Sequence, residues 1–518
     1  MNLVLRLDSL AEERADDLAF QKGSQKFTYS QLWRAVQNQA AVWHAQGLHP
    51  GDRVLFLVPL GVPFFVALLS LWHRGAVAVV LDPGLPASHL DKILKQIQPE
   101  RTLVAGAGWL LWYSRAVLRQ GRRLTLLHSK SSESDLQVPP PVECTPESLA
   151  LLTTTSGTSG DPKIIPRSHG FLKTQSQMVA EHLNLVPGQT DFSTLPIFAL
   201  ANLDHGVATI LPRFSLKKLD RFSWSTIKNE IESCHRLTGA PAFLERLASE
   251  LTRNSAWPTT KHLHTVTTGG APIFPRAVEP WVKLGMRVQL VYGSSEAEPI
   301  AGWELDSHAA LQSWREEIAK GQGLQAGLPV PGLHVRIVRL PAGELSSLSQ
   351  LQWDEAQCAP GQVGEIAVSA NHVVPGYWPD NAARGKKIMA KDRIWHRTGD
   401  GGYLDHNQQL WLTGPWSRHL NMAQGPLPLE AIVMLHPEVR RCVALPTDQN
   451  TWFLFLELMN QGTPAPSFLW PRNYEVQGVF VLPEIPVDPR HRSKVVEAPI
   501  RKKFAAQFAR ASRTPLEG

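Results

Sequence analysis

Short apolar runs alternate with stretches of helical periodicity along most of the chain. Four such runs have the length and composition of buried strands: residues 54–58, 102–106, 124–128 and 149–153. Helical patterns occupy three later segments: residues 170–185, 226–237 and 241–253. Strands that are apolar on both faces and alternate with helices indicate an α/β fold built on parallel sheets.

One apolar stretch allows two interpretations. Residues 54–71 (VLFLVPLGVPFFVALLSL) hold no charge and are long enough to cross a bilayer. However, Pro59, Gly61 and Pro63 interrupt the middle of this stretch. We therefore interpret it as a buried strand followed by a helix that ends at Gly75, with a second strand in residues 76–84. The sequence thus predicts no transmembrane segment.

The pattern changes after about residue 330. Several β segments there resemble hairpins, and from about residue 415 a smaller unit begins. We expect five elements in that unit: a helix at 428–436, strands at 441–446, 452–458 and 478–483, and a basic helix at 497–511. The sequence therefore predicts a large N-terminal domain (1–413) with parallel-rich sheets and a β-rich subdomain. A small, mobile α+β domain (414–518) should follow it.

Composition excludes several classes of protein. The 518 residues include 52 Lys and Arg against 46 Asp and Glu, and these charges are mixed along the chain rather than gathered in one basic patch. A nucleic-acid partner is therefore not expected. The four cysteines lie far apart and form no CxxC pair, which speaks against a zinc ribbon or a disulfide framework. The early acidic residues Asp8, Glu12 and Glu13 exclude a signal peptide, so we expect a cytoplasmic protein.

The strongest local motif is TTTSGTSGDPK at residues 153–163, which follows an apolar strand. Gly157 and Gly160 permit backbone conformations in which several N–H groups can point at phosphate oxygens. Lys163 adds a positive charge, and four hydroxyl side chains add donors: Thr155, Ser156, Thr158 and Ser159. The spacing is not that of a Walker loop. A flexible Ser/Thr/Gly linker is the alternative.

This motif resembles the phosphate loop of the adenylate-forming superfamily of acyl-CoA synthetases, luciferases and peptide-synthetase adenylation domains. Further segments resemble that family's motifs in the same order: residues 269–272 (GGAP), 292–296 (YGSSE), 364–366 (GEI), 398–400 (TGD) and Lys494. These landmarks extend the resemblance over essentially the whole chain. It implies a large α/β domain and a small mobile domain with the active site between them.

The resemblance also implies roles for individual residues, with ATP and Mg²⁺ as cofactors. The 155–163 loop would bind the β- and γ-phosphates, and Glu296 would help to hold Mg²⁺. Asp400 would accept hydrogen bonds from the ribose, and Lys494 would act as the catalytic residue between the carboxylate and the α-phosphate. The residues expected around the adenine are Gly270, Ala271, Pro272, Tyr292, Gly293, Ser294 and Ser295. An exposed glutamate, a turn aspartate and a solvated run of basic residues are the alternatives for Glu296, Asp400 and Lys494.

The predicted hinge departs from the family pattern. The family commonly has GRxK there, whereas this chain has GPWSR at residues 414–418. Pro415 has no guanidinium and a fixed φ, which suggests a stiffer hinge, with Arg418 as a substitute for the missing arginine. Ser493 also replaces the glycine that usually precedes the catalytic lysine.

Three segments indicate which adenylate-forming activity to expect. They resemble the β-lactone synthetases of bacterial olefin biosynthesis, and they lie at residues 195–206, 394–405 and 485–494. The resemblance implies a β-hydroxy acid whose own hydroxyl attacks the acyl-AMP and closes a β-lactone. His205 is a candidate base for that hydroxyl. Three alternatives stay open: a coenzyme A ligase, an enzyme that loads a carrier protein or forms an amide, and a non-catalytic nucleotide-binding protein.

The segments expected around the acyl group are largely apolar, which predicts a small-molecule acid with an aliphatic or aromatic body. They lie near residues 196–206, 239–243, 267–270 and 292–303. The predicted pocket residues are Phe198, Asn202, Phe243 and Trp303.

Overall fold

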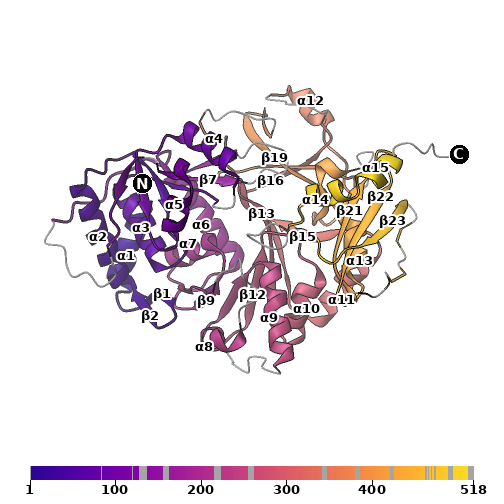
Figure 1. The fold of residues 1–518 in the computed structure, drawn as a ribbon, viewed down its shortest axis with the longest axis horizontal. Helices are drawn as coiled ribbons and strands as arrows, with labels where there is room; N and C mark the ends of the chain where they lie inside the picture. The colour runs from indigo at the N-terminus through magenta and orange to yellow at the C-terminus, as the bar shows by residue number, and fades with distance from the viewer. Residues whose placement is uncertain are drawn as a thin grey trace.

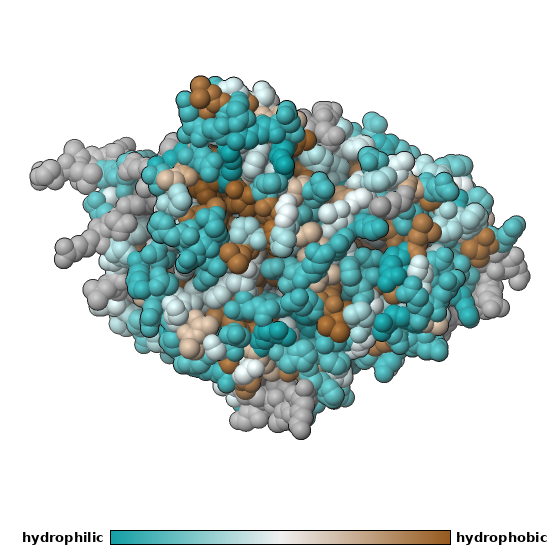
Figure 2. Space-filling model, turned by 180° about the vertical axis from the view of Figure 1, so that it is seen from behind, coloured by the Kyte–Doolittle hydropathy of each residue, from teal (hydrophilic) through white to brown (hydrophobic). Residues whose placement is uncertain are grey.

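The computed structural model describes most of the chain: residues 2–82, 85–119, 121–127, 137–155, 163–214, 223–254, 262–340, 347–379, 386–419, 425–460, 462, 464, 466–467, 470–471, 474–487 and 494–511. The N-terminal and C-terminal parts lie at opposite ends of an elongated molecule (Figure 1). Seen from behind, its surface is mostly hydrophilic, with smaller apolar patches between (Figure 2).

A six-stranded sheet with the order β6-β5-β3-β4-β7-β8 forms part of the N-terminal end in the described chain. Its strands are β3 (Arg53–Leu57), β4 (Val77–Val80), β5 (Arg101–Val104), β6 (Arg122–Leu124), β7 (Leu149–Thr155) and β8 (Lys163–Ser168). Neighbouring strands are parallel except β7 and β8. The helices of this end are α1 (Val4–Glu13), α2 (Tyr29–Ala45), α3 (Val62–His73), α4 (Ala87–Ile97), α5 (Gly108–Ser114) and α6 (His169–Leu183).

The apolar stretch at 54–71 forms strand β3 and the first part of helix α3, as predicted. Phe56, Phe65 and Leu68 are buried in one apolar cluster with α1 and α2. None of the helices in the described residues combines the length and apolarity needed to span a membrane.

The largest sheet runs through the middle of the molecule, in the order β16-β17-β19-β20-β15-β14-β13-β12-β11-β9-β10-β1-β2, with β18 paired to β19. Along this order, all pairs between β13 and β1 are parallel. All pairs between β13 and β16 are antiparallel, as are the β18–β19 and β1–β2 pairs. This sheet thus joins a parallel α/β region to a β-rich region, which confirms the predicted fold class.

Its strands are β1 (Leu18–Lys22), β2 (Gln25–Thr28), β9 (Thr190–Ser193), β10 (Ala208–Ile210), β11 (Arg236–Gly239), β12 (Thr265–Gly269), β13 (Arg287–Ser294), β14 (Ala297–Leu305), β15 (Leu324–Pro329), β16 (His334–Val338), β17 (Gly364–Ser369), β18 (Lys387–Ala390), β19 (Arg393–Leu404) and β20 (Leu410–Pro415). The helices between them are α7 (Pro196–Asp204), α8 (Lys228–Glu232), α9 (Pro241–Arg253), α10 (Pro275–Lys283), α11 (His308–Ala319) and α12 (Gln350–Glu355).

The C-terminal residues form a unit with a sheet of its own, in the order β21-β22-β23. Its elements are α13 (Pro426–Met434), β21 (Val439–Pro446), β22 (Trp452–Leu458), β23 (Val476–Val481), α14 (Glu497–Lys503) and α15 (Ala505–Ala511). Apolar side chains pack on both faces of this sheet. The division of the chain at residues 413 and 414 stays a prediction.

Two predicted helices were wrong in extent. The helix expected at 226–237 is the short α8, because Arg236 and Leu237 belong to β11 and pair with β12. Arg236 is buried and donates to the hydroxyl of Thr267 at 2.9 Å, so a polar contact between strands prevails over the helical pattern. The basic helix expected at 497–511 is interrupted at Phe504, where α14 ends and α15 begins.

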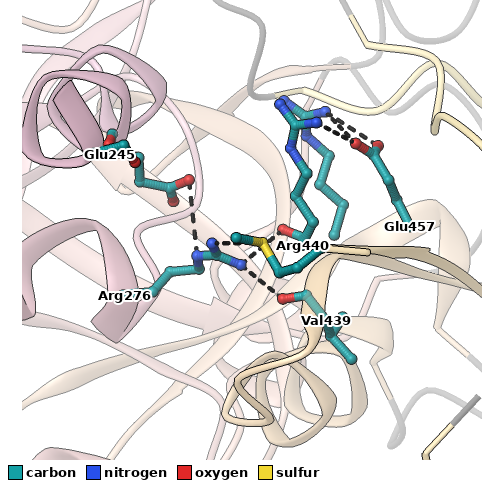
Figure 3. Close-up of polar contacts among 8 residues, drawn as sticks. Glu245, Arg276, Val439, Arg440 and Glu457 are labelled. Carbon is teal, nitrogen blue, oxygen red and sulfur yellow. Dashed lines mark hydrogen bonds and ion pairs between the residues drawn. The ribbon is translucent and has the colours of Figure 1, made fainter. Parts of the chain in front are cut away.

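The large part of the chain holds the C-terminal unit through Arg276 on α10 (Figure 3). Its Nη1 donates to the backbone oxygen of Val439 at 2.6 Å and to that of Arg440 at 3.3 Å. On the other side, its Nε lies 3.9 Å from a carboxylate oxygen of Glu245 on α9. Arg440 itself is paired with the buried Glu457 on β22. Arg276 thus bonds to the edge of β21 and helps to set the position of the small unit.

Candidate active site

Glu296 lies in the turn between β13 and β14, and its carboxylate is nearly buried. The hydroxyl of Tyr377 donates to Oε1 of Glu296 at 3.1 Å. The ring of Tyr377 has the Lys163 ammonium 4.7 Å from its centre and the Lys387 ammonium 5.7 Å from it. Tyr377, itself 1% exposed, therefore connects the end of the predicted phosphate loop, the predicted magnesium ligand and β18.

Lys387 is a fully buried lysine whose ammonium donates to the backbone oxygen of Val374. Burial lowers the pKa of Lys387 to about 7, and the negative charge of Glu296 opposes this change. Glu296 therefore lies in a field of positive charge from Lys387 and its neighbours. Such a field suits a site for anionic phosphates.

Arg167 extends this field from β8. Its guanidinium donates to the hydroxyl of Thr153 and, at 2.7 Å, to the backbone oxygen of Ser295. Burial lowers the pKa of Arg167 to about 10, and the charges of Glu298 and Glu296 oppose this change. The arginine thus ties the strands that flank the predicted phosphate loop to the segment 292–296.

Glu298 is a second carboxylate, two residues beyond Glu296. Burial raises the pKa of Glu298 to about 7, and the positive charges of Arg167 and Lys494 act in the opposite direction. The side-chain amide of Gln175 on α6 donates to the backbone oxygen of Glu298 at 3.2 Å. Two carboxylates and several cations thus meet at the start of β14.

Tyr292 and Asp400 form the other side of the site. The Tyr292 hydroxyl donates to Oδ2 of Asp400 at 2.9 Å, and the backbone N–H of Asp400 donates to the Thr398 hydroxyl at 3.1 Å. Burial raises the pKa of Asp400, whereas the Tyr292 hydrogen bond and the charges of Lys494 and Lys386 lower it. The structure therefore brings together two residues that the sequence predicted for the adenosine.

Lys494 approaches this site from the C-terminal unit. A β-bridge between Val487 and Val495 fixes the chain beside it, and its own side chain is exposed. The positive charge of Lys494 lowers the pKa of both Glu298 and Asp400, so it acts electrostatically on both carboxylates. Its role as the catalytic residue stays a prediction.

The GGAP segment follows β12, next to β13. Gly270 has a φ of +83°, a conformation that favours glycine, and nothing lies within 4 Å of the position where its Cβ would be. Pro272 is exposed and Ala271 half-buried. Gly293 lies against Glu298, the Ser294 hydroxyl is buried and Ser295 is exposed. An open backbone surface next to Tyr292 is compatible with a flat adenine ring.

Part of the predicted site lies outside the described residues. Ser156, Gly157, Thr158, Ser159 and Gly160 belong to this group, and so does Ser493. Thr155 ends β7, but its side chain is also outside the description.

The four predicted pocket residues do not belong to one apolar cluster, and their place in one pocket stays a prediction. Phe198 packs in an apolar cluster with Val291, whereas Phe243 and Trp303 belong to a second cluster. Asn202 is 1% exposed, and its amide donates to Asp191 at 2.9 Å and to Thr209 at 3.1 Å. The side-chain NH2 group of Asn202 is therefore bonded to side chains of β9 and β10.

His205, the candidate base, closes α7 and contacts the backbone oxygen of Ala201 at 3.0 Å. Its Nδ1 also lies 3.7 Å from Asp204, whose backbone oxygen accepts from Arg6 on α1. These contacts connect His205 to the N-terminal helix rather than to Glu298 or Asp400.

At the predicted hinge, Pro415 lies opposite Asp400 in the β19–β20 ladder. Arg418 pairs with Glu497 on α14 at 2.5 Å and lies 3.9 Å from Glu430 on α13. Its guanidinium is thus bound within the hinge and the small unit.

Glu296 has the properties that a magnesium ligand needs. No group of three or more His, Cys, Asp or Glu able to hold a metal occurs in the described part of the chain. Mg²⁺ in nucleotide sites is typically held by one or two carboxylates together with phosphate oxygens and water. A single nearly buried carboxylate, oriented by Tyr377, fits this pattern.

The fold and the site together define a class of protein. A large part rich in parallel strands, followed by a small C-terminal unit with a sheet of its own, is the architecture of adenylate-forming enzymes. The chain resembles an o-succinylbenzoate coenzyme A synthetase of Bacillus subtilis, solved in complex with ATP and magnesium ion. The TM-score is 0.73 at 18% identity, over 95% of this chain and 98% of the other.

Sequence comparison gives the family. Residues 7–378 match the AMP-binding enzyme family, so the chain belongs to that family and is an adenylate-forming ligase. It is 27% identical over 466 residues to an olefin beta-lactone synthetase of Stenotrophomonas maltophilia, covering 83% of this chain and 82% of that protein. It is also 27% identical over 396 residues to a feruloyl-CoA synthase of Amycolatopsis, covering 75% and 73%. The predicted resemblance to both groups is confirmed.

Sequence reasoning missed Arg167, Glu298, Tyr377 and Lys387. For two of them a signal was present. Arg167 lies four residues beyond Lys163 on β8, so both side chains leave the same face of that strand. Glu298 lies two residues beyond Glu296, which stands in the turn before β14. Tyr377 and Lys387 come from a part of the chain whose local pattern gives no indication of its distant partners.

Proposed function

We propose that this ligase activates a β-hydroxy carboxylic acid with ATP as acyl-AMP, releasing pyrophosphate, and then closes the acyl-AMP to a β-lactone with loss of AMP. The observation that carries the first step is the hydrogen bond from Tyr377 to Glu296 beside the Lys163 ammonium, which brings a carboxylate and a cation to the end of the predicted phosphate loop. The charge of Lys494 also acts on Glu298 and Asp400. The second step is supported by the likeness to an olefin beta-lactone synthetase.

In the first step, a carboxylate oxygen of the acid attacks the α-phosphorus of ATP, and the bond to the β-phosphate oxygen breaks. Both reactants are anions, so positive groups must offset their repulsion. Lys163 and Arg167 would face the phosphates from β8, and Lys494 would act between the acid and the α-phosphate. Mg²⁺, held by Glu296, would neutralise phosphate charge when bound.

In the second step, the β-hydroxyl oxygen of the substrate attacks the acyl carbon, the bond from that carbon to the AMP oxygen breaks, and the hydroxyl proton is lost. The nucleophile is already tethered to the electrophile, so the reaction needs no second substrate. Glu298 is the best candidate to accept this proton, because burial raises its pKa to about 7. The contacts of His205 favour it less.

A coenzyme A ligase is the second candidate, supported by the likeness to a feruloyl-CoA synthase. It would share the first step and then admit a thiol or a carrier protein. Arg276 bonds the small unit to α10, so a rotation of that unit to admit a thiol would have to break this contact.

Mass spectrometry of the products separates the two candidates. The protein is incubated with ATP, Mg²⁺ and a 3-hydroxy fatty acid, with and without coenzyme A. A product with the mass of the acid minus water, formed without the thiol, supports the lactone. A thioester that forms only with coenzyme A would support the ligase instead.

The matched control is the fatty acid of equal length without the 3-hydroxyl. It should yield acyl-AMP and pyrophosphate but no lactone, because the nucleophile is absent. Failure of both acids to release pyrophosphate would contradict the proposed substrate class.

A further inference from the structure

Helix α5 exposes an unusual amount of apolar surface for so short an element. The side chains of Leu110 and Tyr113 are 74% and 63% exposed. Trp109 and Trp112 lie half-buried beside them, and Tyr113 packs on both tryptophan rings. Tryptophan and tyrosine favour the boundary between water and lipid, because one part of the ring system is apolar and another forms hydrogen bonds.

Arginines surround this helix. Arg123 lies 5.5 Å from the ring centres of both Trp109 and Trp112, and Arg119 lies 5.4 Å from that of Trp112. Arg119 also donates to the backbone oxygens of Trp112 and Tyr113 at the end of α5. Arg122 is exposed on the adjoining strand β6. We call α5 together with Arg119, Arg122 and Arg123 the α5 surface.

The charge of this region has one sign. From Arg101 to Ser132 the sequence contains no Asp or Glu. Within the part of the chain that the structure describes, no carboxylate pairs with Arg119, Arg122 or Arg123. The acids of neighbouring elements are already engaged, because Asp91 on α4 pairs with Lys95, and Glu100 pairs with Arg53. The arginines therefore keep their charge available for an anionic partner.

We propose that the α5 surface binds anionic lipid membranes from one side. Leu110, Tyr113 and the tryptophans would enter the headgroup boundary, and the three arginines would meet lipid phosphates. Apolar insertion and cationic attraction together are the combination that holds peripheral proteins on charged bilayers. Three arginines that pair with no carboxylate among the described residues favour a lipid surface over an apolar protein partner. This inference does not rest on the proposed function.

Co-sedimentation with vesicles tests the proposal. The full chain should pellet with vesicles of phosphatidylglycerol and phosphatidylcholine more than with phosphatidylcholine alone, and less as salt rises. Leu110→Ser combined with Tyr113→Ser should weaken binding about tenfold or more, since two large exposed apolar groups are lost. Arg122→Gln combined with Arg123→Gln should weaken it by about fivefold per arginine.

Leu351→Ser on α12 is the matched control, because Leu351 is 68% exposed and α12 lies apart from α5 (Figure 1). This variant should bind vesicles like the unchanged protein, and all variants should keep their release of pyrophosphate with a soluble acid. Equal pelleting of all variants, or none by the unchanged protein, overturns the proposal. A dimer that only the α5 variants lose would assign this surface to a second copy instead.

Discussion

The two regions that meet at the site are built in opposite ways. The large part contributes side chains that are buried and held by several partners, such as Arg167 on β8 and Tyr377 beside Glu296. The C-terminal unit contributes Lys494, an exposed side chain next to a single β-bridge. Fixed groups can stabilise charge without reorganising, whereas an exposed group can enter and leave. Under the proposed function, the large part would supply a fixed electrostatic field, and the C-terminal unit would supply a lysine that enters for the first step and can leave afterwards.

The fixed region carries an energetic cost. Buried ions lose hydration, and Lys387 and Glu298 both have pKa values displaced by burial toward their neutral forms. Sites that bind highly charged ligands tolerate this cost because the ligand replaces the lost water. The exposed Lys494 carries no comparable cost. Each prediction below therefore separates a fixed contribution from a mobile one.

The largest effect is expected for Lys494→Ala. Removing a charge that acts mainly in the transition state should slow acyl-AMP formation by ~10²–10³. Conversion of supplied acyl-AMP to lactone should change much less, because no phosphorus is attacked in that step. Pyrophosphate release and lactone formation, measured separately, report the two steps.

Lys502→Ala on α14 is the control, because Lys502 is exposed on the same unit. It should leave both rates unchanged. Equal slowing of both steps by Lys494→Ala would show that the lysine supports the site as a whole. It would contradict the distinction between a fixed large part and a lysine that acts only in the first step.

A smaller effect is expected for Tyr377→Phe within the fixed region. The ring between the two ammonium groups remains, but Oε1 of Glu296 loses its donor at 3.1 Å. Hydrogen bonds to charged groups contribute about 1.5–3 kcal/mol, so kcat/KM for Mg²⁺–ATP should fall ~10-fold or more. The Mg²⁺ concentration needed for half-maximal rate should rise.

Tyr403→Phe provides the control, since the Tyr403 hydroxyl donates to the backbone oxygen of Gln322 at 3.1 Å, away from Glu296. Tyr403→Phe should lose about as much stability as Tyr377→Phe, but the Mg²⁺ concentration needed for half-maximal rate should not change. If Tyr377→Phe behaves in the same way, its role is structural only.

The same contrast explains what the sequence could predict. Local signals placed most of the buried strands, α9 and most elements of the small unit, because apolar periodicity is a property of neighbouring residues. The strand expected at 124–128 was wrong in extent, because β6 covers Arg122–Leu124 and residues 125–127 lie outside any strand. The resemblance pointed to Tyr292 and Asp400, which the structure joins by a hydrogen bond, and to Lys494, whose catalytic role stays a prediction. Tyr377 and Lys387 could not be found, because their roles depend on distant strand pairings.

The prediction of a helix at 226–237 was wrong for a related reason. The sequence around Arg236 has a helical pattern, but its guanidinium donates a hydrogen bond to the Thr267 hydroxyl on the next strand. A buried polar contact between strands outweighed local propensity there. The surroundings of Asn202 show the same limit, because its hydrogen-bond partner Asp191 is known only once β9 is placed, and its role in the acyl pocket stays a prediction.

A third prediction concerns the contact that positions the small unit. Arg276→Ala removes the donor to Val439 and Arg440. The arrangement with Lys494 at the site should become less populated, and acyl-AMP formation should slow about fivefold, the equivalent of about 1 kcal/mol for a hydrogen bond. Lys283→Ala on the same helix, where Lys283 is exposed and paired with Glu279, is the control. Unchanged kinetics for Arg276→Ala would mean that other contacts suffice to hold the unit.

The smallest expected effect is a change in the pH dependence of Tm when Glu298 is replaced, because the charge of Lys494 in the C-terminal unit acts on this carboxylate of the large part. Burial raises the pKa of Glu298 from 4.5 to about 7, so the folded protein holds this proton more tightly than the unfolded chain. Stability from this group is therefore present below pH 4.5 and declines as pH rises to about 7, where the folded state must release the proton. Glu298→Gln should remove this part of the decline in Tm, on the order of 1–2 °C. Glu304→Gln, on the same strand, should keep it.

The same measurement on Lys494→Ala tests whether the lysine acts on Glu298 in the resting protein. The Lys494 charge lowers the pKa of Glu298, so removing it should raise that pKa further and extend the decline in Tm to higher pH. The extension should vanish when Glu298→Gln is added, because the titrating group is then gone. An unchanged profile in Lys494→Ala would mean that the lysine spends little time near the carboxylate. Lys494 would then act on the buried carboxylates only during the reaction. The fixed groups of the large part would set the pKa of Glu298 in the resting protein without the lysine.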